Sequence, residues 1–524
     1  MNVENSPQPT GPEAPIIPAQ HSRVTTLRIS AFLAIMTAVA LRTLFIFRFP
    51  ASAGDSELYL QLAYNWLDHR AYGLWLDGHL VPTDLRMPGY PALLAGIAMI
   101  LGRSLRAITL SQAAIDLATC YLTAMLAAGL APERVRRTVW IAALWLAATC
   151  PFVANYTTVV LTETLVTCFA TAALVCFVWG LKRIPLERGF IASPPRIESV
   201  KLAVLGSFLT GIATLIRPEM PLLFVAAALV YSSRLWRILS IRKIALCGAA
   251  MAGAFLLPLL PWAVRNFVTL HEVQLLAPRY TTMPDEYAPV GYYAWTGTWL
   301  ERYRDVYLSV WKVGEEPIDM DDLPPTAFDS PQEKAQVAAL IDRYNKTPDR
   351  DISPELDREF AKLARERTKR HPFRTYIRAP FERALTVWFT PRTELLPVDG
   401  KLWPLREQWR DSHSDVLTTA GFAALGYLYV ALAAGGVWVA WRSGHLGGGM
   451  PGGSPEAANL WAVSLLLAYL LIRTAFLTTV EAPEPRYVIP CYPAVLALAA
   501  MLFVRPVKQK SESITVPPQA RDES

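Results

Sequence analysis

Long apolar runs recur along most of this chain, and they limit its possible folds more than any other feature. About 20 consecutive apolar residues is the length that a helix needs to cross a bilayer. Because the bilayer core offers no water, a crossing segment must satisfy its own backbone hydrogen bonds, which favours helices. Such runs lie near 28–48, 107–130, 138–157, 164–181, 200–216, 218–235, 244–264, 415–441, 459–480 and 486–504. The sequence therefore predicts an all-α polytopic membrane protein with about ten transmembrane helices.

Composition supports the same class. The 524 residues are 53% hydrophobic and only 18% charged, whereas a soluble domain carries about 25% charged residues. The net charge of +6 comes from basic residues clustered between apolar runs, which is typical of residues that orient a membrane protein rather than bind nucleic acid. We therefore predict membrane lipids as partners and no nucleic acid. The six cysteines lie within apolar runs and form no C-x-x-C pair, so we interpret them as small buried hydrophobes.

Three basic clusters predict the orientation of the chain in the membrane. They lie at 134–137, 182–196 and 234–243. If the short apolar stretch 89–102 does not cross, all three clusters fall on the same side as both termini; if it crosses, they fall opposite Arg23 and Arg28. The excess of positive charge on cytoplasmic loops favours the first arrangement. We predict a half-buried or re-entrant 89–102, cytoplasmic termini, and a multi-pass protein of the plasma (inner) membrane.

This topology divides the chain into five parts. They are a disordered cytoplasmic tail at 1–27, an N-terminal transmembrane catalytic module at 28–264 with an amphipathic first outer loop at 49–106, an extracytoplasmic segment at 265–414, C-terminal transmembrane helices at 415–504, and a cytoplasmic tail at 505–524. In the outer segment, Ser-Pro pairs predict helices at 331–345 and 354–370. A third helix, 373–390, mixes apolar and arginine residues. It lies on the membrane surface or packs against its own domain.

The candidate catalytic residues follow the first apolar run. Asp55 and Glu57 precede an aromatic amphipathic segment. One face of that segment, predicted to lie along the bilayer surface, would contain Tyr59, Leu62, Trp66 and Leu67. A carboxylate held at this level is placed to deprotonate a hydroxyl or an amine. The alternative is that Asp55 caps the N-terminus of a helix and faces water.

Further candidates for substrate or phosphate binding lie at the same predicted outer face. Arg86 precedes the half-buried segment, where it would bind a phosphate bidentately or extend to lipid headgroups. Glu163 begins a span and would position a substrate hydroxyl, help to hold a metal, or favour the helix N-terminus. The remaining candidates are Arg217, Arg265, Arg473, Arg486 and Tyr487. Asp116 lies in the middle of a span, and we interpret it as a hydrogen-bond partner for another helix rather than a catalytic group.

The order of several short motifs resembles a known superfamily. These motifs begin at Gly54 (Gly-Asp-Ser-Glu-Leu-Tyr-Leu-Gln-Leu-Ala), at Arg86 (Arg-Met-Pro-Gly-Tyr-Pro), at Leu161 (Leu-Thr-Glu-Thr-Leu), at Ile216 (Ile-Arg-Pro-Glu), at Pro261 (Pro-Trp-Ala-Val-Arg-Asn) and at Pro485 (Pro-Arg-Tyr-Val-Ile-Pro-Cys-Tyr-Pro). Together they resemble the GT-C glycosyltransferases of the protein-mannosyltransferase and aminoarabinose-transferase type, including the bacterial Rgt-like branch. The acidic pair is Asp-Ser-Glu rather than adjacent Asp-Glu, so the sugar and acceptor of those relatives are not carried over.

The resemblance implies a specific chemistry. The donor would be a sugar on a polyprenyl phosphate, and the acceptor a lipid, a glycan or a protein. Asp55 would activate the acceptor, and direct displacement would invert the anomeric centre of a hexosyl or pentosyl group. Arginines at the lipid phosphate would stabilise the charge that develops there. No cofactor is certain; a divalent metal shared by Asp55 and Glu163 with a histidine is left open.

Two other classes of function are compatible with the spans. A lipid or solute transporter would have inverted repeats, and we find none in the sequence. An oligosaccharide polymerase or ligase would also be polytopic, with a catalytic Arg or His in a large outer loop. If the activity of the protein did not change when Asp55 was lost, this last class would be favoured.

Overall fold

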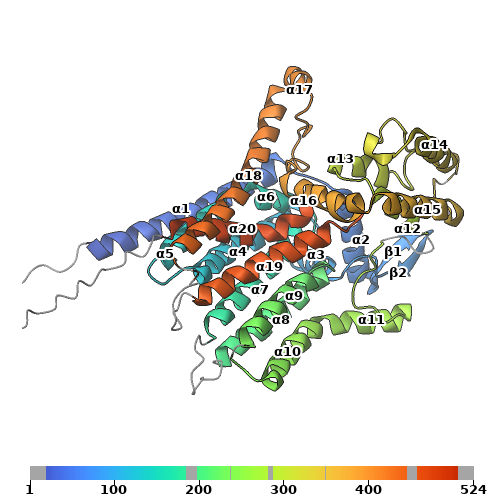
Figure 1. Cartoon of the computed structure of the whole chain (residues 1–524). Helices are drawn as coiled ribbons and strands as arrows, with labels where there is room; N and C mark the ends of the chain where they lie inside the picture. Colours follow the sequence, from blue (N-terminus) through green and yellow to red (C-terminus); the bar gives the residue numbers. More distant parts are fainter. Residues whose placement is uncertain are drawn as a thin grey trace, which may run out of the picture.

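The computed structural model describes residues 19–184, 197–236, 238–280, 287–348, 350–444, 446 and 457–504, and these form a bundle of long helices (Figure 1). Within these ranges, eight helices are long and apolar enough to cross a membrane, or nine if one bent pair is a single span. The prediction of an all-α polytopic membrane protein is confirmed. The eight are Thr25–Arg48 in α1 (Ala19–Arg48), α4 (Leu105–Leu130), α7 (Glu163–Lys182), α8 (Ile197–Ile216), Ile241–Leu270 (α10, Ile241–Leu256, and α11, Leu260–Leu270), α18 (His413–Arg442), Asn459–Leu477 in α19 (Ala457–Leu477), and Pro485–Phe503, which includes α20 (Tyr492–Ala499).

Three of the apolar segments are shorter or bent. The bent pair joins α5 (Arg136–Thr149) to Pro151–Thr158 at 50°, where Pro151 interrupts the helix. Helix α9 (Pro221–Leu235) has only 15 residues, because Pro218 and Pro221 delay its start. Helix α3 (Gly89–Leu101) has 13 residues, a rise of about 20 Å, which is too short to cross. The predicted re-entrant placement of α3 therefore agrees with its length and stays a prediction.

Part of the expected N-terminal tail is helical. Helix α1 begins at Ala19 rather than at 28, whereas residues 1–18 lie outside the described residues. The same holds for the tail 505–524 and for Arg188, Arg196 and Arg237 of the basic clusters.

The first outer loop contains a small sheet that the sequence analysis missed. After α2 (Gly54–His69), strands β1 (Gly73–Leu76) and β2 (His79–Pro82) pair antiparallel. Asp77 and Gly78 join them with φ of 47° and 78°, as a type I′ hairpin turn requires. The Asp-Gly pair was the available sequence signal.

Helix α2 packs inward more than the sequence predicted. Tyr59 and Leu62, expected to face the bilayer surface, are buried. The ring of Tyr59 meets that of Tyr90 on α3 edge-on, with centroids 5.2 Å apart. Trp66 remains exposed and contacts Tyr72 at 5.4 Å. Helix α2 therefore packs against α3, and this contact fixes the position of its first turn.

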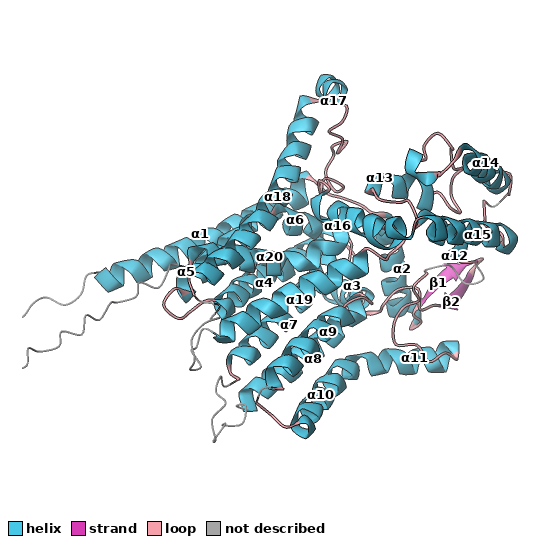
Figure 2. Ribbon diagram, viewed as in Figure 1, coloured by secondary structure: helices cyan, strands magenta, loops and turns pink. Residues whose placement is uncertain are grey.

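The outer segment contains a lobe with its own hydrophobic core, which we call the outer lobe (287–370, except residue 349). It includes α12 (Val290–Thr296), α13 (Tyr303–Asp305), α14 (Pro331–Asn345) and α15 (Pro354–Arg370). Figure 1 shows it in yellow and brown at the end of the bundle where α2 and the hairpin also lie; Figure 2 shows that helices and loops build it. Helices α14 and α15 match the prediction, because the hydroxyls of Ser330 and Ser353 cap them.

The third predicted helix of the outer segment has two different faces. It comprises Arg374–Arg378 and α16 (Ala379–Phe389). On one face, Arg383 is buried and donates hydrogen bonds to the carbonyls of Leu300 (2.8 Å) and Thr478 (3.0 Å). The other face leaves four large apolar side chains exposed, namely Phe373, Tyr376, Ile377 and Phe381. Packing is therefore confirmed for one face, whereas membrane contact of the other face stays a prediction.

A buried ion pair joins three helices inside the bundle. Arg42 Nε on α1 lies 2.7 Å from Asp116 Oδ2 on α4. Another guanidinium nitrogen donates to the Ala147 carbonyl of α5 at 3.1 Å. This confirms Asp116 as a hydrogen-bond partner for another helix. Both side chains are 1% exposed, so the pair tightens the bundle and does not meet substrate.

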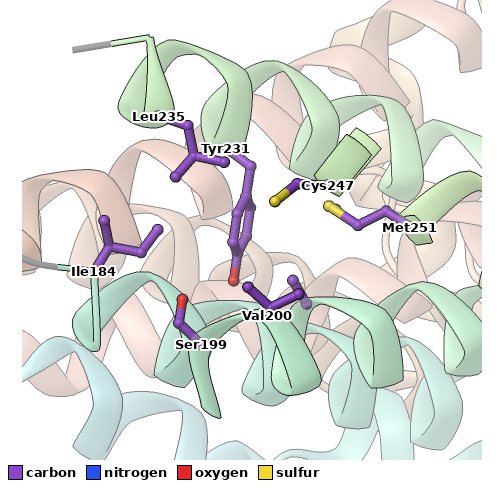
Figure 3. Close-up of a pocket in the computed structure, with 8 residues that line it drawn as sticks. Ile184, Ser199, Val200, Tyr231, Leu235, Cys247 and Met251 are labelled. Carbon is purple, nitrogen blue, oxygen red and sulfur yellow. The ribbon is translucent and has the colours of Figure 1, made fainter. Parts of the chain in front are cut away.

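A small pocket between α8, α9 and α10 is too tight for a substrate. Figure 3 shows its lining, which includes Ser199, Tyr231 and Met251. The cavity volume is about 10 Å³, roughly the space for one water molecule. The Tyr231 hydroxyl already donates to the Phe177 carbonyl at 2.8 Å. This pocket is therefore not the functional site, and the predicted site residues lie at the ends of the helices.

Candidate active site

Asp55 lies in the first turn of α2 and is held between two arginines. Its Oδ1 accepts a hydrogen bond from Arg86 at 2.9 Å, and its Oδ2 accepts one from Arg486 at 3.0 Å. Arg86 precedes α3, and Arg486 begins the last span. The three side chains are between 20% and 26% exposed. Solvent, and hence a substrate, therefore reaches a carboxylate that two separate segments fix in place.

Arg486 extends these contacts to two further carboxylates. Its Nε lies 2.6 Å from Glu484 Oε2 and 4.0 Å from Glu163 Oε1. Glu163 is the first residue of α7 and is nearly inaccessible. The helix N-terminus favours a negative charge there. Arg486 therefore joins the outer loop to the end of a central span.

The chain of charges continues toward α19. Arg217 donates a hydrogen bond to Glu163 at 2.9 Å and lies 2.7 Å from Glu219. Glu219 then accepts a hydrogen bond from Arg473 at 3.2 Å. Arg473 is completely buried, as expected for an intramembrane cation that is paired inside the bundle.

Tyr487 holds the middle of this arrangement. Its hydroxyl donates to Glu484 at 2.6 Å, and its backbone carbonyl accepts from Arg473 at 2.9 Å. The Arg217 guanidinium lies over its ring, 4.8 Å from the centroid. We call the eight charged residues connected in this way the site network. Its members are Asp55, Arg86, Glu163, Arg217, Glu219, Arg473, Glu484 and Arg486.

The network balances four arginines against four carboxylates. Burial alone would raise the pKa of the Asp55 carboxyl, but Arg486 and Arg86 outweigh it and lower that pKa below its usual value. Glu219 likewise lies between two arginines, Arg217 and Arg473. The Asp55 carboxyl is therefore ionised at neutral pH. An anionic substrate group would compete with these carboxylates for the arginines.

Two predicted site residues lie outside the site network. Glu57 is exposed and forms no ion pair with the described residues. Arg265 donates to the backbone carbonyls of Thr83 (2.9 Å) and Tyr72 (2.6 Å). Its guanidinium therefore holds the β1–β2 hairpin against α11. The expectation that Arg265 gathers with the other arginines is not met in this structure.

The residues do not assemble a metal site. Asp55 and Glu163, the two carboxylates considered for a shared ion, are each engaged by arginine. Within the described ranges, no three His, Cys, Asp or Glu side chains gather as metal ligands. The donor set of the described residues therefore does not fit a bound divalent ion.

The sequence analysis did not select Glu219 and Glu484 as site residues. Each belongs to a short Pro-centred motif, Arg217-Pro-Glu219 or Glu484-Pro-Arg486, whose arginine and glutamate pair with each other. The intervening proline fixes the backbone, and this repeated pattern was the available signal. A second omission is aromatic. Burial, and then the charge of Glu484, raise the pKa of the Tyr303 hydroxyl in the outer lobe.

Comparison with known proteins gives two weak structural likenesses. No protein-family model matches this sequence, and no curated protein matches it significantly. One similar structure is the archaeal oligosaccharyltransferase AglB from Archaeoglobus fulgidus, in complex with an inhibitory peptide and a dolichol-phosphate. It is 14% identical with a TM-score of 0.45, and the match covers 92% of this chain and 50% of that chain. The other is ArnT from Cupriavidus metallidurans bound to undecaprenyl phosphate. It is 13% identical with a TM-score of 0.33, and the match covers 85% of this chain and 77% of that chain.

Both structures hold a polyprenyl phosphate, a dolichol-phosphate in AglB and undecaprenyl phosphate in ArnT. The chain spans about half the length of the AglB chain. We assign residue roles from the geometry of this chain alone.

Proposed function

We propose that this protein is an integral membrane glycosyltransferase. It would move a sugar from a polyprenyl-phosphate donor to a lipid, glycan or protein acceptor at the extracytoplasmic face, with inversion. The observation that supports this most directly is an ionised, partly exposed carboxylate fixed between two arginines, Asp55 between Arg86 and Arg486. One group can accept a proton while the other two stabilise a departing phosphate.

The proposed step balances as a single displacement. An acceptor hydroxyl attacks the anomeric carbon and gives its proton to Asp55. The bond between that carbon and the phosphate oxygen breaks, and the polyprenyl phosphate leaves with the electron pair. Arg86 and Arg486 lie within hydrogen-bond distance of Asp55. They can therefore stabilise the negative charge that develops on a donor phosphate bound beside Asp55.

The same arginines give the base a dependence on donor binding. In the structure, their guanidinium groups hold the pKa of Asp55 low, which makes it a weak proton acceptor. A donor phosphate would share these guanidinium groups and so weaken their hold on Asp55. The carboxylate would then become more basic only when donor is present.

The other predicted residues would support this site. Glu163, Arg217 and Arg473 continue the network into the bundle, and Tyr487 fixes their spacing. We propose that these four residues position the reacting groups. Glu57 is exposed, so we propose that it orients the loop, and Arg265 would position the hairpin above α2.

Analysis of lipids in a deletion strain tests the function. Loss of the enzyme should cause accumulation of a polyprenyl-phosphate sugar and loss of that sugar from one envelope lipid, glycan or protein. Transfer by the purified protein, with the anomeric configuration of the product read by NMR, should show inversion. A deletion strain whose polyprenyl-phosphate sugars and glycans are unchanged would contradict the proposal and return attention to transport or to glycan polymerisation and ligation.

A further inference from the structure

A second cavity lies at the end of the bundle opposite the site network. It has a volume of about 580 Å³ and lies between α1, α4, α5 and α7. Its lining combines three arginines with two tryptophans and apolar side chains; the polar and aromatic members are Arg28, Arg136, Arg137, Trp140 and Trp179. The proposed transferase function does not use this cavity.

Helix α7 sets the distance between the two regions. Its first residue, Glu163, belongs to the site network, and Trp179 lines the cavity near its last residue, Lys182. Trp179 follows Glu163 by 16 residues of this helix, a rise of about 24 Å, which is most of the thickness of a bilayer core. The cavity therefore lies at the level of the opposite membrane–water interface.

The charge of the cavity is positive and poorly compensated. Within the described ranges, Arg28 and Arg137 form no ion pair or hydrogen bond, and both are exposed. Arg136 pairs with Glu133 at 3.2 Å, but the glutamate side chain is 87% exposed, and such surface pairs contribute little. The Nε of Arg136 is buried without a hydrogen-bond partner. The site therefore offers an unsatisfied donor and two unpaired cations.

The apolar part of the cavity is held in a fixed shape. The indole Nε1 of Trp179 donates to the Met125 carbonyl at 3.2 Å, and the Arg136 guanidinium lies 5.5 Å from the ring centroid. Trp140 packs edge-on against Tyr121 with centroids 6.1 Å apart. Tryptophan is typical of the membrane interface, where one side is apolar and the other is wet. A small soluble anion would leave these apolar walls uncovered.

We propose that this cavity binds one anionic phospholipid, with its phosphodiester between the arginines and the start of its acyl chains against Trp140 and Trp179. Basic pockets between transmembrane helices bind anionic headgroups in this way. The lipid would join α1 to α5 and α7 at the end of the bundle where the basic clusters lie.

The test uses the full-length protein in detergent, titrated with phosphatidylglycerol or phosphatidylcholine and followed by native mass spectrometry. We expect phosphatidylglycerol to bind more tightly. Replacing both Arg28 and Arg137 with Gln should weaken it by roughly 25-fold, about fivefold for each cation. Arg134→Gln is the matched control for Arg137→Gln, since Arg134 is exposed and does not line the cavity.

Three results would overturn this proposal. They are equal binding of the two lipids, equal weakening by Arg134→Gln and Arg137→Gln, and full displacement of phosphatidylglycerol by inorganic phosphate. Thermal unfolding in phosphatidylcholine alone should be the same for wild type and variants, because all three arginines lie at the surface or rim. Wild-type selectivity between the lipids tests the site even if a variant folds poorly.

Discussion

The outer lobe and the end of the helix bundle each contain a network of arginines and carboxylates, but the two are built differently. At the lobe, Arg367 and Arg370, together with Arg374 just beyond its last helix, surround Asp329 and Glu333. We call these five residues the lobe network. Its members lie within 46 consecutive residues, 329–374. The site network instead joins segments from Asp55 to Arg486. The first therefore fixes a local structure, and the second holds together elements that are remote in sequence.

Access to solvent also separates the two networks. Arg367 is fully buried, and it donates further hydrogen bonds to Thr298 and to the carbonyl of Ala327, each at 2.9 Å. The N–H groups of the Arg367 guanidinium are thus all engaged within the lobe. Asp55, Arg86 and Arg486 remain reachable, so they can exchange their partners for a ligand. Similar residue types thus serve stability in one region and, we infer, chemistry in the other.

The largest expected effect separates catalysis from stability. Asp55→Asn keeps the shape of the side chain and removes the base, so transfer from a polyprenyl-phosphate sugar should fall on the order of 10²–10⁴-fold. The substitution also removes the ion pairs with Arg86 and Arg486, but because these side chains are 20–26% exposed, the loss of thermal stability should be small. Glu57→Gln, two residues away and unpaired, is the control and should be much milder. Near-normal transfer by Asp55→Asn would remove Asp55 from the mechanism.

The lobe network should show the opposite behaviour. Arg367→Met removes the fully buried cation that Asp329 and Glu333 share and leaves only the more exposed Arg370 and Arg374 beside them. Breaking a buried pair of this kind costs about 3–5 kcal/mol. We expect a lower thermal midpoint and faster hydrogen exchange across 290–370. Arg343→Met is the matched control on α14, because the Arg343–Glu359 pair is about half exposed and should contribute at most about 1 kcal/mol. Equal losses in both variants would mean that the buried network does not hold the lobe.

The sequence predicted the spans and the lobe helices well, because both depend on residues that are close together in the chain. Hydropathy and length determine the spans, and Ser330 and Ser353 mark the starts of α14 and α15 by capping. Helix α9 is shorter than predicted because its apolar run contains Pro221 at the helix start. The hairpin was missed because its strands have only four residues each, too short for alternation to be evident.

The partners within the candidate site could not be predicted in the same way. The sequence placed Arg86, Glu163 and Arg486 at one face, and the structure brings them together. Their pairing depends on helix packing, since Arg486 and Asp55 are 431 residues apart. Arg265 shows the limit of the reasoning: it shares that predicted face, yet backbone carbonyls of the hairpin take up its donors.

A smaller effect distinguishes phosphate binding from simple charge. Lysine cannot reproduce the planar fork of arginine, so Arg486→Lys should weaken donor binding by roughly 10- to 100-fold, the range of lost charged hydrogen bonds. Apparent donor affinity of the purified variant measures this. Arg103→Lys, in the exposed pair with Asp68, should bind donor like wild type. If Arg486→Lys also does so, the phosphate is bound elsewhere.

The smallest effect is a shift in pH dependence, and it tests whether the arginines control the base. The pKa of Asp55 is lowered because Arg486 and Arg86 overcome the effect of burial. An ionised Asp55 is thus maintained below the ordinary aspartate pKa of about 3.9. Its stabilising ion pairs are present above that value and are lost only as pH falls through the lower, folded-state pKa. The acid limb of kcat/KM should follow the same titration.

Arg86→Gln removes one of the two cations that lower this pKa, so the acid limb should move to higher pH while the chain remains folded. Arg103→Gln removes an equal charge at an exposed site and should leave the limb in place. A pure loss of packing would lower the rate at every pH without moving the limb. An unmoved limb in Arg86→Gln would show that a group other than Asp55 sets it. The site network would then resemble the lobe network, a structural support without control over the base.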